Sequence, residues 1–281
     1  MILATSNIDG SALTFNATVR GLAIYLDNWA VGDLAEGDPS RRNRFIAALC
    51  SGSADLMFSV TNAAELAGPQ GKSFDVVKSF LNEVGPNWFP VELDPFLVVH
   101  REQNGADPAQ SCISEGFMKA YFADRTASYS PGSGRIIDLS DTFFGLDAVL
   151  DWVAPQRDSI RKQSAEFDNV LRETICKERA KYEQHPLPIL RFSPSLRATL
   201  TAFNLVRTLI AESTPVKPGD GLDFCHAVMA SSFASVAALD GPWKRRLEKL
   251  PEHNKLARIY SGPELDKMVT DVESWITSID F

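Results

Sequence analysis

Three short apolar segments that alternate with helical segments constrain the fold of this chain more than any other feature. They are GLAIYL (residues 21–26), ADLMFSV (54–60) and WFPVEL (88–93), and amphipathic stretches such as NWAVGDLAEG and GKSFDVVKSFLNEVG separate them. A strand with no polar face must be covered on both sides, as strands are in a parallel sheet between helices. Strands that alternate with helices are joined by right-handed crossovers. The sequence therefore predicts an α/β fold, a three-layer α/β/α arrangement with a short, mostly parallel sheet.

The middle of the chain lacks these strand signals. Residues 108–129 and 154–184 each have a helical pattern, SPGSGR (130–135) has the composition of a loop, and the prolines of 185–195 exclude a continuous helix. We therefore expect residues 94–201 to form a helical insertion or cap.

The α/β pattern returns near the end of the chain. A helical segment (218–233) precedes the short apolar segment ASVAAL (234–239), and two further helices are expected at 242–250 and 262–279. Residues 1–93 and 202–281 are thus predicted to form the two parts of one core.

Composition restricts the classes of partner. The formal net charge of -8 argues against a general nucleic-acid coat protein or a protein that binds anionic membranes, although an acidic enzyme site filled by divalent cations fits that charge. The N-terminal residues lack the basic start and long apolar core of a signal peptide, and no apolar segment approaches the roughly 20 residues of a membrane span. We expect a soluble, cytoplasmic protein without a membrane partner.

Four acidic residues stand where the strands end or where the following helices begin. Asp27 and Asp240 directly follow apolar segments, Glu65 is expected in the first turn of the helix after the second strand, and Asp223 near the start of another helix. In an open parallel sheet these positions converge on one crevice. Gathered carboxylates repel one another unless cations bridge them, and oxygen ligands suit Mg²⁺ or Mn²⁺. Such cations activate water and stabilise the leaving oxygen of a phosphodiester.

The segments that carry these acids resemble the PIN-domain family of metal-dependent ribonucleases. The matching segments are IYLDNWAVGDLA, MFSVTNAAELAG and GDGLDFCHAVMASSFASVAALDGPWKRRL, in which Asp223 and Asp240 are 17 residues apart. The resemblance implies a PIN-like core in which Asp27, Glu65, Asp223 and Asp240 are catalytic and bind Mg²⁺ or Mn²⁺. It also implies an endoribonuclease whose products carry 5′-phosphate and 3′-hydroxyl ends. DNA stays open as a substrate, because attack by a metal-activated water does not use the 2′-hydroxyl.

Six further residues are candidates for supporting roles, and each has a purely structural alternative. Asn28, Asp220 and His226 are possible accessory residues of the site, but Asp220 also fits the N-cap of its helix and His226 a structural hydrogen bond. Lys244, Arg245 and Arg246 are possible phosphate contacts, or a solvated helix face. Asp27 itself fits the N-cap of the helix that begins at Asn28.

Two other functions stay open. A catalytically silent PIN-like scaffold that acts through protein contacts is favoured by the helical block and by Trp29, which stands where family members usually carry a small polar residue. A metal-dependent phosphatase acting on small substrates is favoured by the net charge of -8. As an endoribonuclease the protein would serve as a toxin or defence effector, with an inhibitor protein or a second copy of the chain as possible partners.

Overall fold

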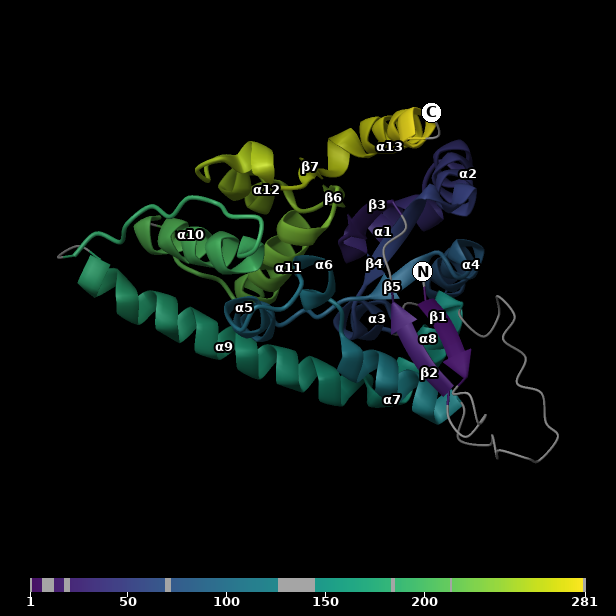
Figure 1. Ribbon diagram of the computed structural model, residues 1–281, viewed down its shortest axis with the longest axis horizontal. Helices are drawn as coiled ribbons and strands as arrows, with labels where there is room; N and C mark the ends of the chain where they lie inside the picture. Colours follow the sequence, from purple (N-terminus) through teal and green to yellow (C-terminus); the bar gives the residue numbers. More distant parts are fainter. Residues whose placement is uncertain are drawn as a thin grey trace.

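A five-stranded parallel sheet forms the centre of the computed structural model, which describes residues 2–6, 13–17, 21–68, 72–125, 145–182, 185–212 and 214–279. The loop expected at 130–135 lies outside these residues. The strand order is β5-β4-β3-β6-β7, and every neighbouring pair is parallel (Figure 1). The strands are β3 (Leu22–Leu26), β4 (Ala54–Phe58), β5 (Trp88–Pro90), β6 (Val236–Ala238) and β7 (Arg258–Tyr260). The predicted α/β fold is confirmed.

Two groups of helices flank this sheet. In the first, α1 (Asn28–Glu36) contacts α2 (Pro39–Ala48) and α4 (Lys72–Val84), and α2 contacts α13 (Leu265–Ile279). In the second, α11 (Asp220–Phe233) contacts α9 (Arg157–Tyr182), α10 (Arg197–Ala211) and α12 (Gly241–Glu248). Strand β6 contacts both α11 and α13, so the sheet lies between the two groups. The predicted three-layer arrangement is therefore confirmed, and it explains why β4 and β6 are buried at every position.

The described part of residues 94–201 is mostly helical, and residues 185–196 lie outside any helix, as their prolines predicted. It contains α5 (Pro95–Gln103), α6 (Pro108–Ser111), α7 (Glu115–Arg125), α8 (Leu146–Val153) and α9, which runs along one side of the molecule beneath α10, α5 and α3 (Val60–Leu66) (Figure 1). Helix α10 crosses residue 201 and packs on both α5 and α11.

The helical pattern of residues 108–129 is interrupted in the structure, because residues 112–114, between α6 and α7, are not helical, and residues 126–129 lie outside the described residues. The backbone there bonds to the chain at β5: Ser114 N donates to Pro90 O (3.1 Å) and Glu92 N donates to Cys112 O (2.8 Å). The edge strand β5 offers unpaired N–H and C=O groups, and hydrogen bonds to them replace those that a continuous helix would make.

Two strand features escaped the sequence analysis. Strand β7 is only three residues long and Arg258 within it is exposed, so it has no apolar pattern. The chain also begins with an antiparallel pair, β1 (Ile2–Ser6) and β2 (Leu13–Ala17). Among the residues described, none of the helices has the length and apolar character that crossing a bilayer requires.

Candidate active site

Asp27 and Asp240 lie at the same edge of the sheet. Strands β3 and β6 are parallel neighbours with Leu26 opposite Ala238, and Asp27 N donates to Ala238 O (3.0 Å). The Asp27 carboxylate also caps α1 by accepting from Asn28 N (2.8 Å). Asp240 precedes α12, is exposed, and makes no side-chain cap to that helix. This edge is where the strand order reverses direction in sequence, the usual place for a site in an open α/β sheet.

Asp223 reaches the same region from the first turn of α11. Its Oδ2 accepts a hydrogen bond from Trp243 Nε1 (3.2 Å), and the side chain is half-buried. Trp243 lies on α12, so this bond ties the helix that carries Asp223 to the helix that follows Asp240.

Glu65 lies in the second turn of α3, and its expected place in the first turn is wrong. The helix begins early, at Val60, because Ser59 and Asn62 form a reciprocal capping box: Asn62 N donates to Ser59 Oγ (3.0 Å) and Ser59 N donates to Asn62 Oδ1 (3.2 Å). The helix N-terminus therefore does not account for an acid at residue 65.

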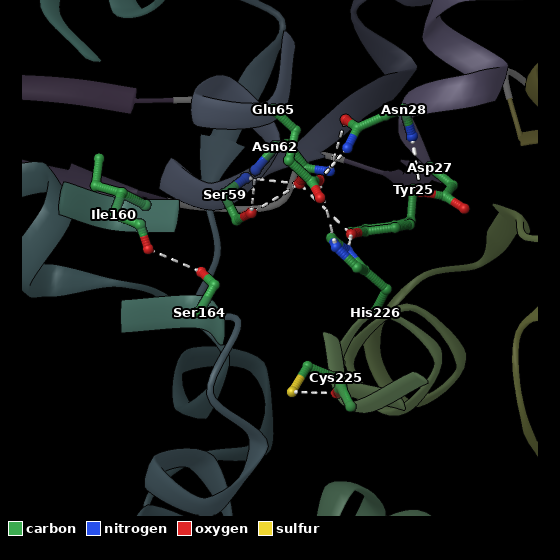
Figure 2. Close-up of polar contacts among 11 residues, drawn as sticks. Tyr25, Asp27, Asn28, Ser59, Asn62, Glu65, Ile160, Ser164, Cys225 and His226 are labelled. Carbon is green, nitrogen blue, oxygen red and sulfur yellow. Dashed lines mark hydrogen bonds and ion pairs between the residues drawn. The ribbon is translucent and has the colours of Figure 1, made fainter. Parts of the chain in front are cut away.

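A network of polar side chains surrounds Glu65 (Figure 2). Asn28 Nδ2 donates to Glu65 Oε2, and Asn62 Nδ2 donates to Asn28 Oδ1 (3.3 Å). Tyr25 from β3 and His226 from α11 are hydrogen-bonded to each other through the hydroxyl and Nδ1, and the Tyr25 hydroxyl lies 3.4 Å from Asn62 Oδ1. Asn28 thus connects the start of α1 to the acid of α3.

His226 is buried and aimed at the same acid. Its Nε2 lies 3.7 Å from Glu65 Oε2 and makes no hydrogen bond with the residues described. Burial lowers the pKa of His226 to about 4, so the ring is neutral near neutral pH. A neutral ring that accepts from Tyr25 at Nδ1 carries its proton on Nε2, where it faces the carboxylate. His226 therefore faces Glu65 as a neutral, buried ring at 3.7 Å, without a hydrogen bond to it.

Burial and mutual repulsion raise the pKa values of three of the acids. Asp27 has a pKa of about 7 because it is buried and because Asp240 and Asp223 are negatively charged. Glu65 also has a pKa of about 7, through burial and then the charge of Asp27, while the Asn28 hydrogen bond opposes the shift. Burial, followed by Asp240, raises the pKa of Asp223 to about 6. Asp240 and Asp223 therefore act electrostatically on Asp27, and Asp27 and Asp223 act on Glu65.

The donor atoms of this cluster suit a hard divalent cation. Carboxylate and amide oxygens are the ligands that Mg²⁺ and Mn²⁺ prefer, and a cation would relieve the repulsion that raises the three pKa values. Within the described ranges, no three His, Cys, Asp or Glu side chains lie close enough together to hold a metal ion. The fit to a metal thus rests on donor chemistry and electrostatics.

Asp220 is the first residue of α11, and its expected role as the N-cap is wrong. Gly219, with φ 94°, takes the cap position, and Asp220 Oδ2 accepts from Lys217 N (2.6 Å). The start of α11 is held instead by Asp168, a buried acid of α9 that accepts from Gly221 N (2.6 Å) and Gly219 N (3.2 Å). Asp168 therefore fixes the turn that presents Asp223, and Asp220 contributes to the site only through its charge.

The three basic candidates of α12 have different surroundings. Lys244 Nζ is paired with Glu264 (2.5 Å), and Arg246 Nε donates to Glu212 Oε2 (3.0 Å) while its guanidinium lies 4.5 Å from the centre of the Trp243 ring. Arg245 is exposed and lines a surface cavity of about 480 Å³. Phosphate contact by any of the three stays a prediction, and Arg245 has the most accessible charge.

A larger groove of about 820 Å³ opens beside Glu65. One wall is α9, which contributes Arg157, Arg161 and Ser164, and the other walls come from Asn28, α3 and the start of α11. Figure 2 shows Ser164 on α9, its hydroxyl bonded to Ile160 O (3.1 Å). The site is therefore bounded by a helix of the predicted insertion.

The Trp29 side chain packs away from the acids, although the sequence places it two positions after Asp27. Its ring lies near Gly262 at the start of the C-terminal helical segment, and the indole packs against the core. Asn28 makes the contact to Glu65 instead.

Several residues of the site were not found from the sequence. The pair Ser59 and Asn62 carries a recognisable capping signal, an S-x-x-N sequence before an apolar helix, whereas Tyr25, Trp243 and Asp168 look like ordinary core or surface residues in the sequence. Comparisons of the chain with protein-family models, with curated proteins and with solved structures give no match.

Proposed function

We propose that this protein is a PIN-type nuclease that hydrolyses phosphodiester bonds, with RNA as its substrate and Mg²⁺ or Mn²⁺ as its cofactor. The observation that carries the proposal is the burial of Asp27, Glu65 and Asp223 near one another and near Asp240, because burial first and the neighbouring acidic charges second raise the pKa values of these three acids. Uncompensated carboxylates destabilise a fold, and their retention favours a role in binding cations.

The residues of the chain divide the work in this proposal. Asp27, Asp223 and Asp240 would hold the cations, which when bound supply activated water and charge neutralisation at the phosphate. Glu65, with a pKa of about 7, is suited to take a proton from the attacking water. Asn28 orients the Glu65 carboxylate by a hydrogen bond, and the His226 ring faces it at 3.7 Å.

Calorimetric titration of Mn²⁺ into the wild-type protein and Asp240→Asn tests the proposal. The carboxylate of Asp240 makes no side-chain cap, so its substitution removes a ligand and leaves α12 intact. Asp38→Asn is a matched control, because Asp38 is an exposed N-cap at the start of α2. We expect the wild type and Asp38→Asn to bind Mn²⁺ and to cleave labelled RNA of mixed structure, and Asp240→Asn to lose both.

The outcomes separate the competing functions. A wild-type protein that binds no Mn²⁺ would support the silent scaffold. Metal binding without RNA cleavage, together with hydrolysis of small phosphate esters, would support the phosphatase. Cleavage of single-stranded DNA and RNA at equal rates would leave the nuclease in place and refute its preference for RNA.

A further inference from the structure

The inward face of α9 changes character along its length. Leu171 and Ile175, in the C-terminal half, are buried where the helix packs on α10 and α11. Two to four turns towards the N-terminus, the same face carries Ser164, Arg161 and Arg157, which line the groove beside Glu65 together with Asp168. The N-terminal half of α9 therefore presents a polar, basic wall to the candidate site.

The two arginines of this wall differ from those of α12. Arg161 is exposed, and within the part of the chain that the structure describes it makes no hydrogen bond or ion pair, although its charge lowers the pKa of Glu65. Arg157 is partly buried, its Nε has no hydrogen-bond partner among the described residues, and Asp158 lies 3.7 Å away. Both guanidinium groups thus keep donors for a ligand in the groove.

The groove continues along α9 into a small, mostly apolar pocket, whose lining also includes Glu92, Asp94 and Gln163. This pocket has a volume of about 240 Å³, shares Thr61, Ser164 and Leu222 with the groove, and is lined further on by Phe167 and Leu93. The Phe167 ring packs near the Phe96 ring, with 6.0 Å between the ring centroids. A flat ring of the substrate can stack on such an aromatic side chain.

We propose that α9 binds a single nucleic-acid strand, with a backbone phosphate at Arg157 and Arg161 and one unpaired base in the pocket at Phe167. Guanidinium groups recognise phosphate through paired donors, and aromatic stacking accepts any base. This assignment rests on the proposed function, because it supplies the groove with a polyanionic substrate. It also gives the predicted helical insertion a role in substrate binding.

The binding of fluorescein-labelled, unpaired RNA of mixed sequence, measured by anisotropy in EDTA, tests this inference without cleavage. We expect Arg161→Ala to weaken binding about tenfold and to reduce the salt slope by about 0.7, the value for one phosphate contact on a single strand. Lys162→Ala is the matched control, since Lys162 is an exposed cation at the next position of α9 and does not line the groove. It should change affinity less than about twofold.

A second pair of variants tests the base pocket. Phe167→Ala should weaken binding of the unpaired strand about tenfold and leave binding of the same sequence as a duplex unchanged. Phe167→Leu removes the ring but keeps most of the side-chain volume, so the same selective loss in this variant excludes a folding defect.

The inference is overturned if Arg161→Ala and Lys162→Ala weaken binding equally, if duplex binds as tightly as the unpaired strand, or if the wild type binds no RNA. A parallel cleavage assay with Mn²⁺ separates the two proposals. If the wild type cleaves RNA and Arg161→Ala binds it with unchanged affinity, only the proposed role of α9 is refuted, and the nuclease stands. If Arg161→Ala loses binding selectively while the wild type cleaves no RNA, the nuclease is refuted and the strand-binding role of α9 is supported.

Discussion

Replacing Asp27 with Asn tests whether the carboxylates at the sheet edge are retained at a cost to stability. In the folded protein, burial and then the charges of Asp240 and Asp223 raise the pKa of Asp27 to about 7 from the ordinary value of 3.8. The ionised form is therefore less favourable in the folded than in the unfolded state. Asn keeps the acceptor that caps α1 through Asn28 N and removes the charge. We expect Asp27→Asn to stabilise the metal-free protein.

The magnitude follows from the pKa difference. At 1.36 kcal/mol per pKa unit, the shift corresponds to an upper bound of about 4 kcal/mol, which we reduce to about 2 kcal/mol because the side chain is partly exposed. Below pH 3.8, the pKa of Asp27 in the unfolded chain, the acid is protonated in both states and does not lower the free energy of unfolding. The cost grows as the pH rises towards about 7 and is constant above it. The gain from Asp27→Asn should therefore be full at about pH 8 and fall below about 1 kcal/mol at about pH 5.

Urea denaturation in EDTA at these two pH values measures the effect. Asp38→Asn makes the same chemical change at an exposed N-cap and should shift the free energy of unfolding by less than about 0.5 kcal/mol. With Mn²⁺ at a hundredfold excess over its dissociation constant, the wild type should gain about 2.7 kcal/mol and the variant much less, which reverses their order. Equal or lower stability of Asp27→Asn at the higher pH would refute the reasoning and leave Asp27 as a helix cap.

Three further predictions concern the contacts that hold the second layer of helices, and urea denaturation with circular dichroism checks each. Asp168→Ala should destabilise the protein by about 2–4 kcal/mol, because it leaves the N–H groups of Gly219 and Gly221 without their acceptor; a loss below about 1 kcal/mol would contradict this. Glu102→Ala should cost a similar amount, about 2–4 kcal/mol, since Glu102 is buried and accepts from the backbone N–H (2.8 Å) and hydroxyl (2.7 Å) of Thr199 at the start of α10. Gly221→Ala should also destabilise the protein, because the added Cβ would lie 2.8 Å from the Cα of Asp168. The loss should therefore persist in the Asp168→Ala background; if Gly221→Ala lowers the free energy of unfolding in the wild type but not in Asp168→Ala, only the Asp168 side chain is in the way.

The central strands and their order in the sheet illustrate how far local sequence information extends. Strand β3 is an uninterrupted apolar segment and strand β4 is apolar except for Asp55, and both must be covered on both faces, so they could be recognised individually. Strand β7, with its exposed Arg258, carries no such pattern and is recognisable only by its hydrogen bonds to β6. The break between α6 and α7 likewise depends on the chain at β5, which is more than twenty positions away from it in the sequence.

The candidate site divides in the same way. Acids placed after apolar strands pointed to Asp27 and Asp240, because parallel strands end at a common edge. No sequence pattern indicated that Arg161 of α9 acts on Glu65, or that Asp168 holds the helix start that carries Asp223, since these contacts join residues 50 or more positions apart through packing of the helical block.

By itself the sequence determined the α/β class, the apolar strands and the position of each acid along the chain, since strand burial and helix capping depend on neighbouring residues. Only the tertiary structure decided which charges act on one another, which of them are already paired, and which helix wall faces the acids. Electrostatic interactions depend on distance through space and on burial, and packing between distant segments sets both.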